Sequence, residues 1–292
     1  MLKHPLVSVV MGYYNHGKYL PFCLNSIFNQ GIKNIEVILV NDASTDNSLE
    51  IAKKFANKDK RIIVLENKQN RGCAKSTERA MKYARGKYIS LTSADDGMLP
   101  GNLKEKIKLL EENPDVGFVF SEVRIISQNG EKIMDSNYRK KKSYIGREDY
   151  EDFIKYGTFI HTGTIVARKE VFKSVNYYNS KFSQAGEWYT QLKLVKNYKS
   201  AYLAKPLMFF RLHDSNLSNS FNLNRSEREF KEIINKLLNE NPSKKVERFL
   251  LASFNYSMGR AYLDKKKYLK ALKYFIISFL KNPACIKSHL IN

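Results

Sequence analysis

The first regular segment of the chain reads Leu6-Val-Ser-Val-Val-Met-Gly-Tyr-Tyr-Asn15, an apolar and β-branched run that turns polar at its end. The same change occurs in Val37-Ile-Leu-Val-Asn-Asp-Ala-Ser-Thr-Asp46 and again in Tyr88-Ile-Ser-Leu-Thr-Ser-Ala-Asp-Asp96. Short continuous apolar runs are typical of strands that are buried on both faces of a sheet. Each stretch therefore predicts a buried strand that delivers polar side chains at its carboxyl end.

Helix-like segments separate these strands. We expect strands at residues 6–11, 35–40, 61–65, 88–92 and 117–121, and helices at 18–29, 47–55, 75–85 and 102–111. This alternation predicts an α/β fold: a Rossmann-like, mainly parallel sheet with helices on both faces. Ligands of such sheets bind beyond the carboxyl ends of the strands. The chemistry is therefore expected just after Met11, Val40, Leu65 and Thr92.

The second half of the chain becomes helical. Strands are expected near residues 164–167 and 201–203, with a helix at 187–197 before the second of them. Ser226 and Glu229 have the spacing of a capping box and predict a helix that opens there and runs to Leu238, before Asn241-Pro242. We therefore expect two domains, a catalytic domain at residues 1–220 and a helical C-terminal extension at 221–292.

The end of this extension has small residues at Gly259, Ala261, Ala271 and Ser278, with aromatic residues between them. The pattern resembles one tetratricopeptide repeat, a helical hairpin. A single repeat cannot bury its own apolar face. The hairpin is therefore expected to pack on the catalytic domain, on a second copy of the chain, or on a membrane surface.

The composition is strongly basic, with 50 Lys and Arg against 29 Asp and Glu and a formal net charge of +21. Such a charge suggests an anionic partner, either acidic lipid or phosphorylated small molecules, although a lysine-rich bias spread over solvated surfaces would look the same. Neither a helix-turn-helix, a zinc finger nor an aromatic RNA-binding motif accompanies the charge, so nucleic acid is not expected.

Cysteine usage and hydropathy suggest a cytoplasmic protein. The three cysteines, at positions 23, 73 and 285, are odd in number and far apart, as expected for reduced thiols. No apolar run approaches the ~20 residues that span a bilayer, and residues 1–5 do not read as a signal peptide. The expected location is cytoplasmic, with peripheral contact at the inner membrane face as one use of the C-terminal helices.

The pair Asp95-Asp96 carries the clearest chemical signal. Two adjacent carboxylates directly follow a buried strand, and like charges repel unless a cation lies between them. Carboxylate oxygens suit Mg²⁺ or Mn²⁺, and such an ion can bridge a diphosphate. The pair therefore predicts a divalent metal at this edge of the sheet.

Five segments together resemble the family 2 glycosyltransferases, whose fold is GT-A. They are, in order, Val7–Asn15, Val37–Asp46, Asn70–Gly72, Gly86–Ile89 and Ala94–Asp96, and the likeness extends over roughly residues 5–215. The resemblance implies a metal-dependent, inverting transferase. Its donor would be a nucleotide-diphosphate sugar, with a UDP-sugar expected. Its acceptor would be a hydroxyl of a glycan or lipid-linked saccharide in surface polysaccharide or glycoconjugate synthesis.

The resemblance also implies roles for individual residues on the donor side. Asp42 would bind the nucleotide base, Asp95 the ribose and Asp96 the metal ion. The other implied donor-binding residues are Gly12, Tyr14, Asn15 and Arg71. One position departs from the family pattern, because Ser93 stands where the first acid of Asp-Ala-Asp-Asp is usual.

Two later segments complete the resemblance. Glu187, in Gly186-Glu187-Trp188, lies where the family has its general base, although an acid in the first turn of a helix can also simply interact with the helix dipole. His213, in Arg211-Leu-His213, would contact the metal or the leaving diphosphate, or would be structural. The segment from His161 to Thr164 resembles the acceptor-side lining.

Two other functions fit part of the pattern. A sugar nucleotidyltransferase would share the sheet and the acids, but it should have a glycine-rich, basic loop after its first strand, where this chain has Gly12-Tyr13-Tyr14-Asn15. A non-catalytic binding or scaffold protein would use the C-terminal hairpin as its working part. The retained series Asp42, Asp95, Asp96 and Glu187 favours catalysis.

Overall fold

The computed structural model describes residues 4–137, 142–146, 149–156, 159–216 and 222–283. It divides the chain into two compact units, one made of residues 1–147 and 160–214 and the other of residues 148–159 and 215–292. The first unit contains the sheet and the second is helical. The short segment 148–159 belongs to the helical unit, although it lies well before the expected boundary at residue 220. The assignment of catalysis to residues 1–220 stays a prediction.

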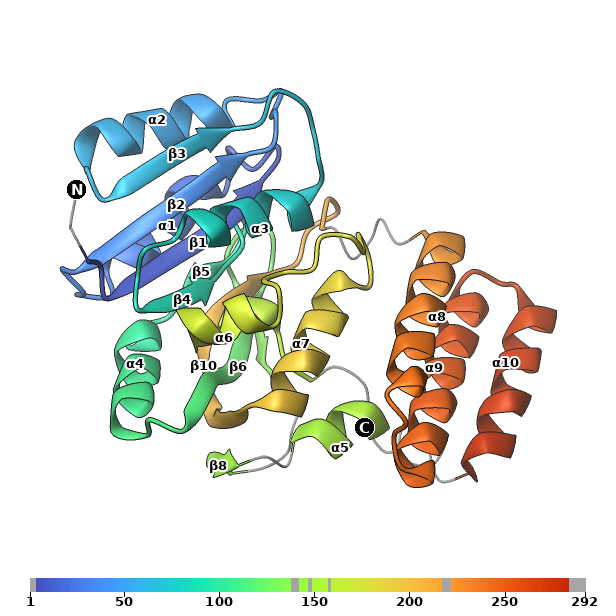
Figure 1. Cartoon of the computed structure of the whole chain (residues 1–292). Coiled ribbons are helices and arrows are strands. Elements are labelled where there is room, and N and C mark those ends of the chain that lie inside the picture. Colours follow the sequence, from blue (N-terminus) through green and yellow to red (C-terminus); the bar gives the residue numbers. More distant parts are fainter. Residues whose placement is uncertain (1–3, 138–141, 147–148, 157–158, 217–221, 284–292) are drawn as a thin grey trace. The chain divides into compact units, whose positions relative to one another are not determined.

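A ten-stranded, mostly parallel sheet forms the centre of the first unit (Figure 1). Eight strands follow the order β3-β2-β1-β4-β9-β6-β10-β5, while β7 pairs with β6 and β8 pairs with β10. β1, β2, β3 and β4 run parallel, and β6 and β10 are parallel to each other, while β9 and β5 run antiparallel to their neighbours. The strands are β1 (Val7–Tyr13), β2 (Ile35–Asn41), β3 (Ile62–Glu66), β4 (Tyr88–Leu91), β5 (Gly97–Met98), β6 (Val116–Ile126), β7 (Lys132–Asp135), β8 (Tyr144–Gly146), β9 (Val166–Arg168) and β10 (Lys199–Arg211). The predicted α/β fold with a mainly parallel sheet is confirmed.

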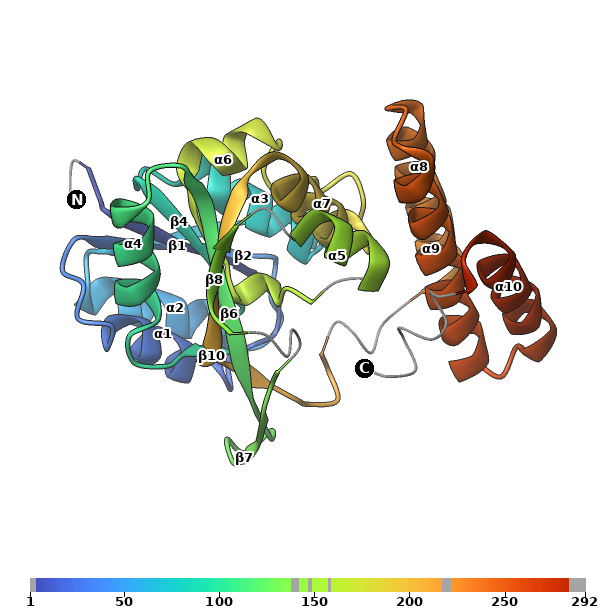
Figure 2. The same cartoon turned by 90° about the horizontal axis from the view of Figure 1, so that it is seen from below.

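Helices cover both faces of this sheet (Figure 2). On one face lie α1 (Leu20–Phe28), α2 (Ser48–Lys58) and α4 (Asn102–Glu112); on the other lie α3 (Cys73–Tyr83), α6 (Lys169–Ser174) and α7 (Gly186–Asn197). The side chains of β1 contact both helix layers, because successive side chains of a strand point to opposite faces of the sheet. Val9 and Met11 are buried in the core shared with α1, α2 and α4. Gly12 faces α3, where an added Cβ would lie 2.6 Å from the Cβ of Ser76.

Most of the expected elements are present, but β10 is much longer than the predicted strand at residues 201–203. Its alternation is hidden in the sequence by Lys205 and Pro206, where the pairing with β6 shifts register. A proline within a sheet is tolerated at such irregularities because the ladder hydrogen bond is already lost there. The other expected strand starts later, at Val166, after the short 3-10 helix η1 (Thr162–Thr164).

The second unit consists of α5 (Asp149–Tyr156), α8 (Leu223–Asn239), α9 (Lys244–Asp264) and α10 (Tyr268–Lys281). The other three helices pack against α9. Tyr262 of α9 and Ala271 of α10 are buried in its core. An added Cβ at Gly259 would lie 2.7 Å from the ring of Phe275, so the small residue permits the close approach of the two helices. The helical hairpin predicted for the C-terminal part is thus present.

The predicted capping box at Ser226 and Glu229 is wrong. α8 begins earlier, at Leu223, and the side chain of Asn222 accepts the N–H of Arg225 at 3.0 Å. Ser226 is buried inside the helix, and Glu229 pairs with Arg225. An asparagine side chain caps the free amides at the start of a helix as well as a serine does. Asn222 and Ser226 were therefore both possible N-cap residues, and the helix begins at the earlier one.

Across the described ranges, no helix is both long enough and apolar enough to cross a membrane.

Candidate active site

Asp42 is the first residue after β2, and it organises the turn that leads into α3. Its side chain is buried, and its Oδ1 accepts hydrogen bonds from the N–H of Arg71 at 2.9 Å and from Nδ2 of Asn67 at 2.7 Å. Its Oδ2 accepts the N–H of Gly72 at 2.8 Å, and Gly72 has a φ of +90°, which favours glycine. Asp42 therefore fixes the backbone of the segment that contains Arg71. The contact between Asp42 and a nucleotide base stays a prediction.

The loop after β1 is tied to the loop after β2 by Asn15. The Oδ1 of Asn15 accepts the N–H of Thr45 at 2.8 Å, and the N–H of Asn15 donates to Oγ of Ser44 at 3.0 Å. Asn15 has a φ of 56°, a conformation that asparagine tolerates better than most residues. The neighbouring Tyr14 is exposed, whereas Gly12 is buried against α3. Hydrogen bonds thus hold the two loops together as one wall of the candidate site, and the side chain of Tyr14 in the first loop is exposed to solvent.

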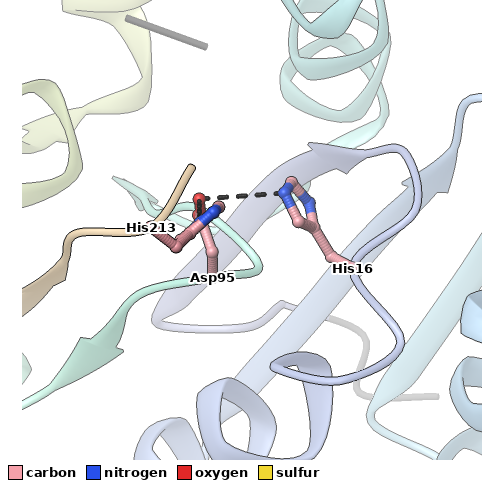
Figure 3. Close-up of side chains that lie close together, drawn as sticks. All are labelled: His16, Asp95 and His213. Carbon is pink, nitrogen blue, oxygen red and sulfur yellow. Dashed lines mark hydrogen bonds and ion pairs between the residues drawn. The ribbon is translucent and has the colours of Figure 1, made fainter. Parts of the chain in front are cut away.

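Three side chains from distant parts of the sequence form a compact cluster beside this wall (Figure 3). Nε2 of His213 lies 3.0 Å from Oδ2 of Asp95, and Nε2 of His16 lies 3.7 Å from the same oxygen. His16 comes from the loop after β1, Asp95 follows β4, and His213 follows β10. One ligand atom from each of the three residues lies within 4.8 Å of the others. This cluster is a candidate divalent-metal site.

The electrostatics of the cluster suit a cation. Burial alone would raise the pKa of Asp95, but the nearby His16 and hydrogen bonds from Ser93 and His213 outweigh it and hold that pKa below its usual range. Burial lowers the pKa of His16 and outweighs the opposing attraction of Asp95. Asp95 is therefore an anion and His16 a neutral imidazole at neutral pH, which are the forms that bind metals. Two imidazoles and a carboxylate suit Mn²⁺ better than Mg²⁺, which prefers oxygen ligands.

Asp96 lies outside this cluster. It is buried, and its Oδ1 accepts the N–H of Arg211 at 3.0 Å. Burial, followed by the charge of Asp95, raises the pKa of Asp96 well above its usual range. Ser93, which replaces the usual first acid, donates its hydroxyl to Oδ1 of Asp95. The metal role of Asp96 stays a prediction, and Asp95 is the acid that belongs to the candidate cluster.

Glu187 lies in the first turn of α7 and is exposed, so an acceptor can reach it. Its Oε1 accepts a hydrogen bond from the hydroxyl of Thr162, in η1, and its Oε2 accepts one from the hydroxyl of Tyr178 at 3.1 Å. Nε2 of Gln191 lies 3.5 Å from Oε1. The hydroxyls of Thr162 and Tyr178 and the amide of Gln191 are neutral groups that fix the direction of the carboxylate, an arrangement compatible with a general base.

Three of the predicted acids affect the pKa of one thiol, that of Cys73. Burial is the main reason why its pKa rises to about 11; a hydrogen bond with Thr77 opposes the rise, and the negative charges of Asp95, Glu187 and Asp42 add to it. Three acids from separate strand ends and from α7 therefore act on one thiol at the start of α3. The fold brings the predicted donor-side acids and the predicted base to the same edge of the sheet.

Two contributors to the site were not predicted from the sequence, His16 and Tyr178. His16 lies in the loop after β1, where the sheet rule expects chemistry, and that position was its only signal. Tyr178 lies in the loop before α7, and nothing in the surrounding sequence distinguishes it from other aromatic loop residues. Arg211 was predicted only as part of the segment that includes His213. Its Nε donates to the carbonyl of Asp95 at 3.0 Å, which fastens the end of β10 to the loop after β4.

Comparisons with solved structures identify the fold. The structure of residues 1–349 of TarS from S. aureus, in complex with UDP-GlcNAc, aligns with a TM-score of 0.71 at 19% identity, covering 95% of this chain and 81% of that one. A mannosyltransferase from Pyrobaculum calidifontis, in complex with GDP-Man and Mn²⁺, aligns with a TM-score of 0.61 at 16% identity, covering 98% and 87%. The fold is GT-A, as predicted.

Comparisons of sequence identify the family. An uncharacterized glycosyltransferase of Methanocaldococcus jannaschii is 34% identical over 214 residues, which is 72% of each chain. Another, of Haemophilus influenzae, is 29% identical over 233 residues, or 76% of this chain and 70% of that protein. The profile described as "Glycosyl transferase family 2" matches residues 8–175. With its strand-end acids and its GT-A sheet, the chain belongs to glycosyl transferase family 2.

Proposed function

We propose that this glycosyltransferase moves a sugar from a nucleotide-diphosphate sugar to an acceptor hydroxyl with inversion of configuration, using a divalent cation. The observation that carries the proposal is the cluster of His16, Asp95 and His213 at the carboxyl edge of the parallel strands. The bound UDP-GlcNAc in TarS and the bound GDP-Man and Mn²⁺ in the mannosyltransferase support a nucleotide-sugar donor.

The donor side is assigned to the strand ends. Asp42, Gly12, Tyr14, Asn15 and Arg71 would bind the nucleotide, for which we favour a UDP-sugar. His16, Asp95 and His213 would hold the cation, with Asp96 supporting the loop from behind. Mn²⁺ or Mg²⁺ held there would supply positive charge against the negative charge that develops on the departing nucleoside diphosphate.

The acceptor side is assigned to Glu187. Its carboxylate takes the proton of the acceptor hydroxyl while the acceptor oxygen forms a bond to the anomeric carbon. The bond from that carbon to the diphosphate oxygen breaks on the opposite face, and the nucleoside diphosphate leaves with the electron pair. Thr162 and Tyr178 orient the carboxylate through the hydrogen bonds described above. The proposed acceptor is a glycan or lipid-linked saccharide of surface polysaccharide synthesis.

The experiment is a screen of nucleotide sugars for release of nucleoside diphosphate, with and without Mn²⁺, using wild type and Asp95→Asn. We expect metal-stimulated release with at least one UDP-sugar and its loss in Asp95→Asn. Asp135→Asn is the matched control, because Asp135 is a half-exposed acid paired with Arg124 at the surface. Release that survives a chelator, or that is equal in wild type and Asp95→Asn, contradicts the metal assignment.

The same screen, extended to nucleoside triphosphates supplied with sugar 1-phosphates, separates the two other functions. A nucleotidyltransferase would release pyrophosphate from a nucleoside triphosphate and a sugar 1-phosphate, and a scaffold protein would bind without turnover. Either result in place of nucleoside diphosphate release overturns the proposal.

A further inference from the structure

Helix α10 carries a row of large apolar side chains that remain exposed. Leu269 is 87% exposed and Leu280 is 75% exposed. With them we define the outer stripe of α10 as Tyr268, Leu269, Leu272, Ile276, Phe279 and Leu280. At 3.6 residues per turn these positions fall within an arc of about 120°. The stripe is therefore continuous along the helix, and single exposed apolar residues elsewhere do not compare with it.

The opposite side of α10 is already used for packing. Ala271 and Ser278 are buried, and the hydroxyl of Ser278 donates to the carbonyl of Ala252 in α9 at 2.8 Å. Phe275 is packed against the cores of the hairpin. The outer stripe thus cannot turn inward without breaking the contacts between α9 and α10.

The charge beside the stripe is of one sign. Residues 265–281 contain six lysines and no aspartate or glutamate. Three of the lysines immediately precede α10 at positions 265–267, and Lys270, Lys273 and Lys281 lie on the helix. From the helical spacing, Lys273 borders the stripe next to Leu280, whereas Lys270 and Lys281 lie about 80–100° further round the helix from Leu280. An apolar stripe with lysines along one side is complementary to a lipid bilayer, whose acyl chains are apolar and whose headgroups can be anionic.

We propose that α10 docks in the plane of an anionic lipid bilayer. The outer stripe would enter the boundary between headgroups and acyl chains, and Lys273 with the exposed lysines at positions 265–267 would lie at the phosphate level. With 14 residues, α10 is too short to span a bilayer, so it would lie along the surface. A symmetric pair of copies is disfavoured, because a two-fold contact through the stripe would bring the lysines of both copies together. The proposal does not depend on the catalytic assignment.

The test is co-sedimentation of the full chain with vesicles. One set is phosphatidylcholine alone, and the other contains phosphatidylglycerol as its anionic component. We expect sedimentation with the anionic vesicles at low salt, a marked decrease at about 1 M salt, where charges are screened within about 3 Å, and little binding to the neutral vesicles. No binding to anionic vesicles at low salt overturns the proposal.

Variants separate the two parts of the surface. Leu269→Asn with Leu280→Asn should weaken binding about tenfold or more, because each leucine loses the transfer of its side chain into the apolar boundary. Ile133→Asn with Met134→Asn, at two exposed apolar positions in β7, is the matched control and should bind as wild type does. Lys273→Glu, beside the stripe, should weaken binding to the anionic vesicles at least about fivefold, and the exposed Lys60→Glu should weaken it less.

Three further outcomes overturn the proposal. The first is equal loss in the control variants, which would indicate non-specific attraction of a basic protein. The second is a concentration-dependent dimer, seen by analytical ultracentrifugation without lipid and abolished by Leu269→Asn with Leu280→Asn. The third is binding that appears only when residues 284–292 are removed, since the chain itself would then cover the stripe. Unchanged circular dichroism and thermal unfolding confirm that each variant is folded.

Discussion

The backbone N–H of Arg211 donates to Oδ1 of Asp96 at 3.0 Å, although the two residues are 115 positions apart. The side chain of Arg211 also donates to the carbonyls of Asp95, Ser127 and Gln128. The end of β10 and the loop after β4 are therefore held as one piece. Because His213 follows Arg211 by two residues, this contact sets the distance between His213 and Asp95.

Arg211→Met should destabilise the protein and loosen the cluster. The substitution leaves the buried carbonyl of Asp95 without its charged donor and removes two part-buried hydrogen bonds, to Ser127 and Gln128. This should lower the free energy of unfolding by about 3 kcal/mol. Urea unfolding measures the change, and Mn²⁺ titration should show weaker binding in the variant that remains folded. The control is Arg124→Met, which breaks a half-exposed ion pair with Asp135 and should lower the free energy of unfolding by about 1 kcal/mol or less. Equal losses in the two variants would contradict the proposed role of Arg211.

Mn²⁺ binding should depend more on Asp95 than on Asp96. Asp95→Asn removes the anion at the centre of the cluster, and we expect at least about 100-fold weaker Mn²⁺ binding, with about tenfold for His16→Gln. Asp96→Asn should keep most of the affinity, because Oδ1 of Asp96 is occupied by Arg211. Calorimetry or electron paramagnetic resonance of Mn²⁺ measures binding without turnover. If Asp96→Asn loses the ion and Asp95→Asn keeps it, the assignment based on family resemblance is right and the cluster is not the metal site.

Glu187→Gln should reduce kcat by about 10²- to 10⁴-fold and leave donor affinity nearly unchanged, because the amide retains the shape but cannot accept the proton. Steady-state kinetics with the acceptor measure this. Glu170→Gln is a suitable control, since Glu170 also lies in the first turn of a helix and tests for a mere interaction with the helix dipole. A loss confined to KM would indicate that Glu187 binds the acceptor instead.

The stability of the sheet unit should depend on pH through Lys106. Its amine is fully buried and donates to Oδ1 of Asn102 at 3.1 Å and to the carbonyl of Thr164. Burial lowers the pKa of Lys106 from 10.5 to about 7, with Glu105 opposing the shift. Between these two values the unfolded chain binds the extra proton. The contribution of Lys106 to the free energy of unfolding should therefore rise with pH across this window, by up to about 1.4 kcal/mol per unit.

Urea unfolding at several pH values between the two pKa values tests this. Lys106→Met should have a shallower rise with pH than wild type, whereas Lys104→Met, at an exposed position of the same helix, should follow wild type. If Lys106→Met and wild type have parallel pH profiles, Lys106 is not the group that titrates.

The strand ends could be predicted because each of them depends on local pattern. The apolar run before Asp95 and Asp96 predicts a buried strand, and the parallel order places its end beside those of β1 and β2. The different surroundings of Asp95 and Asp96 could not be predicted, because they depend on Arg211, which comes from another strand. His16 has only its position after β1 as a signal, since its place in the cluster depends on a contact with Asp95, 79 positions later in the sequence. The length of β10 was hidden by the bulge at Pro206, where the alternation that marks a strand is interrupted.

The helical unit is assembled from two separate pieces of chain, residues 148–159 and residues 215–292. A truncated protein that ends at residue 214 would keep α5 but lose α9, the helix against which α5 packs. The truncated chain would keep the buried side chains of Phe153 and Ile154 on α5 while losing the helix that packs against α5. The chain passes between the two units three times, so exchange of the helical unit between relatives by recombination would require three simultaneous junctions. Its sequence is therefore expected to be inherited together with that of the sheet and not as an interchangeable module.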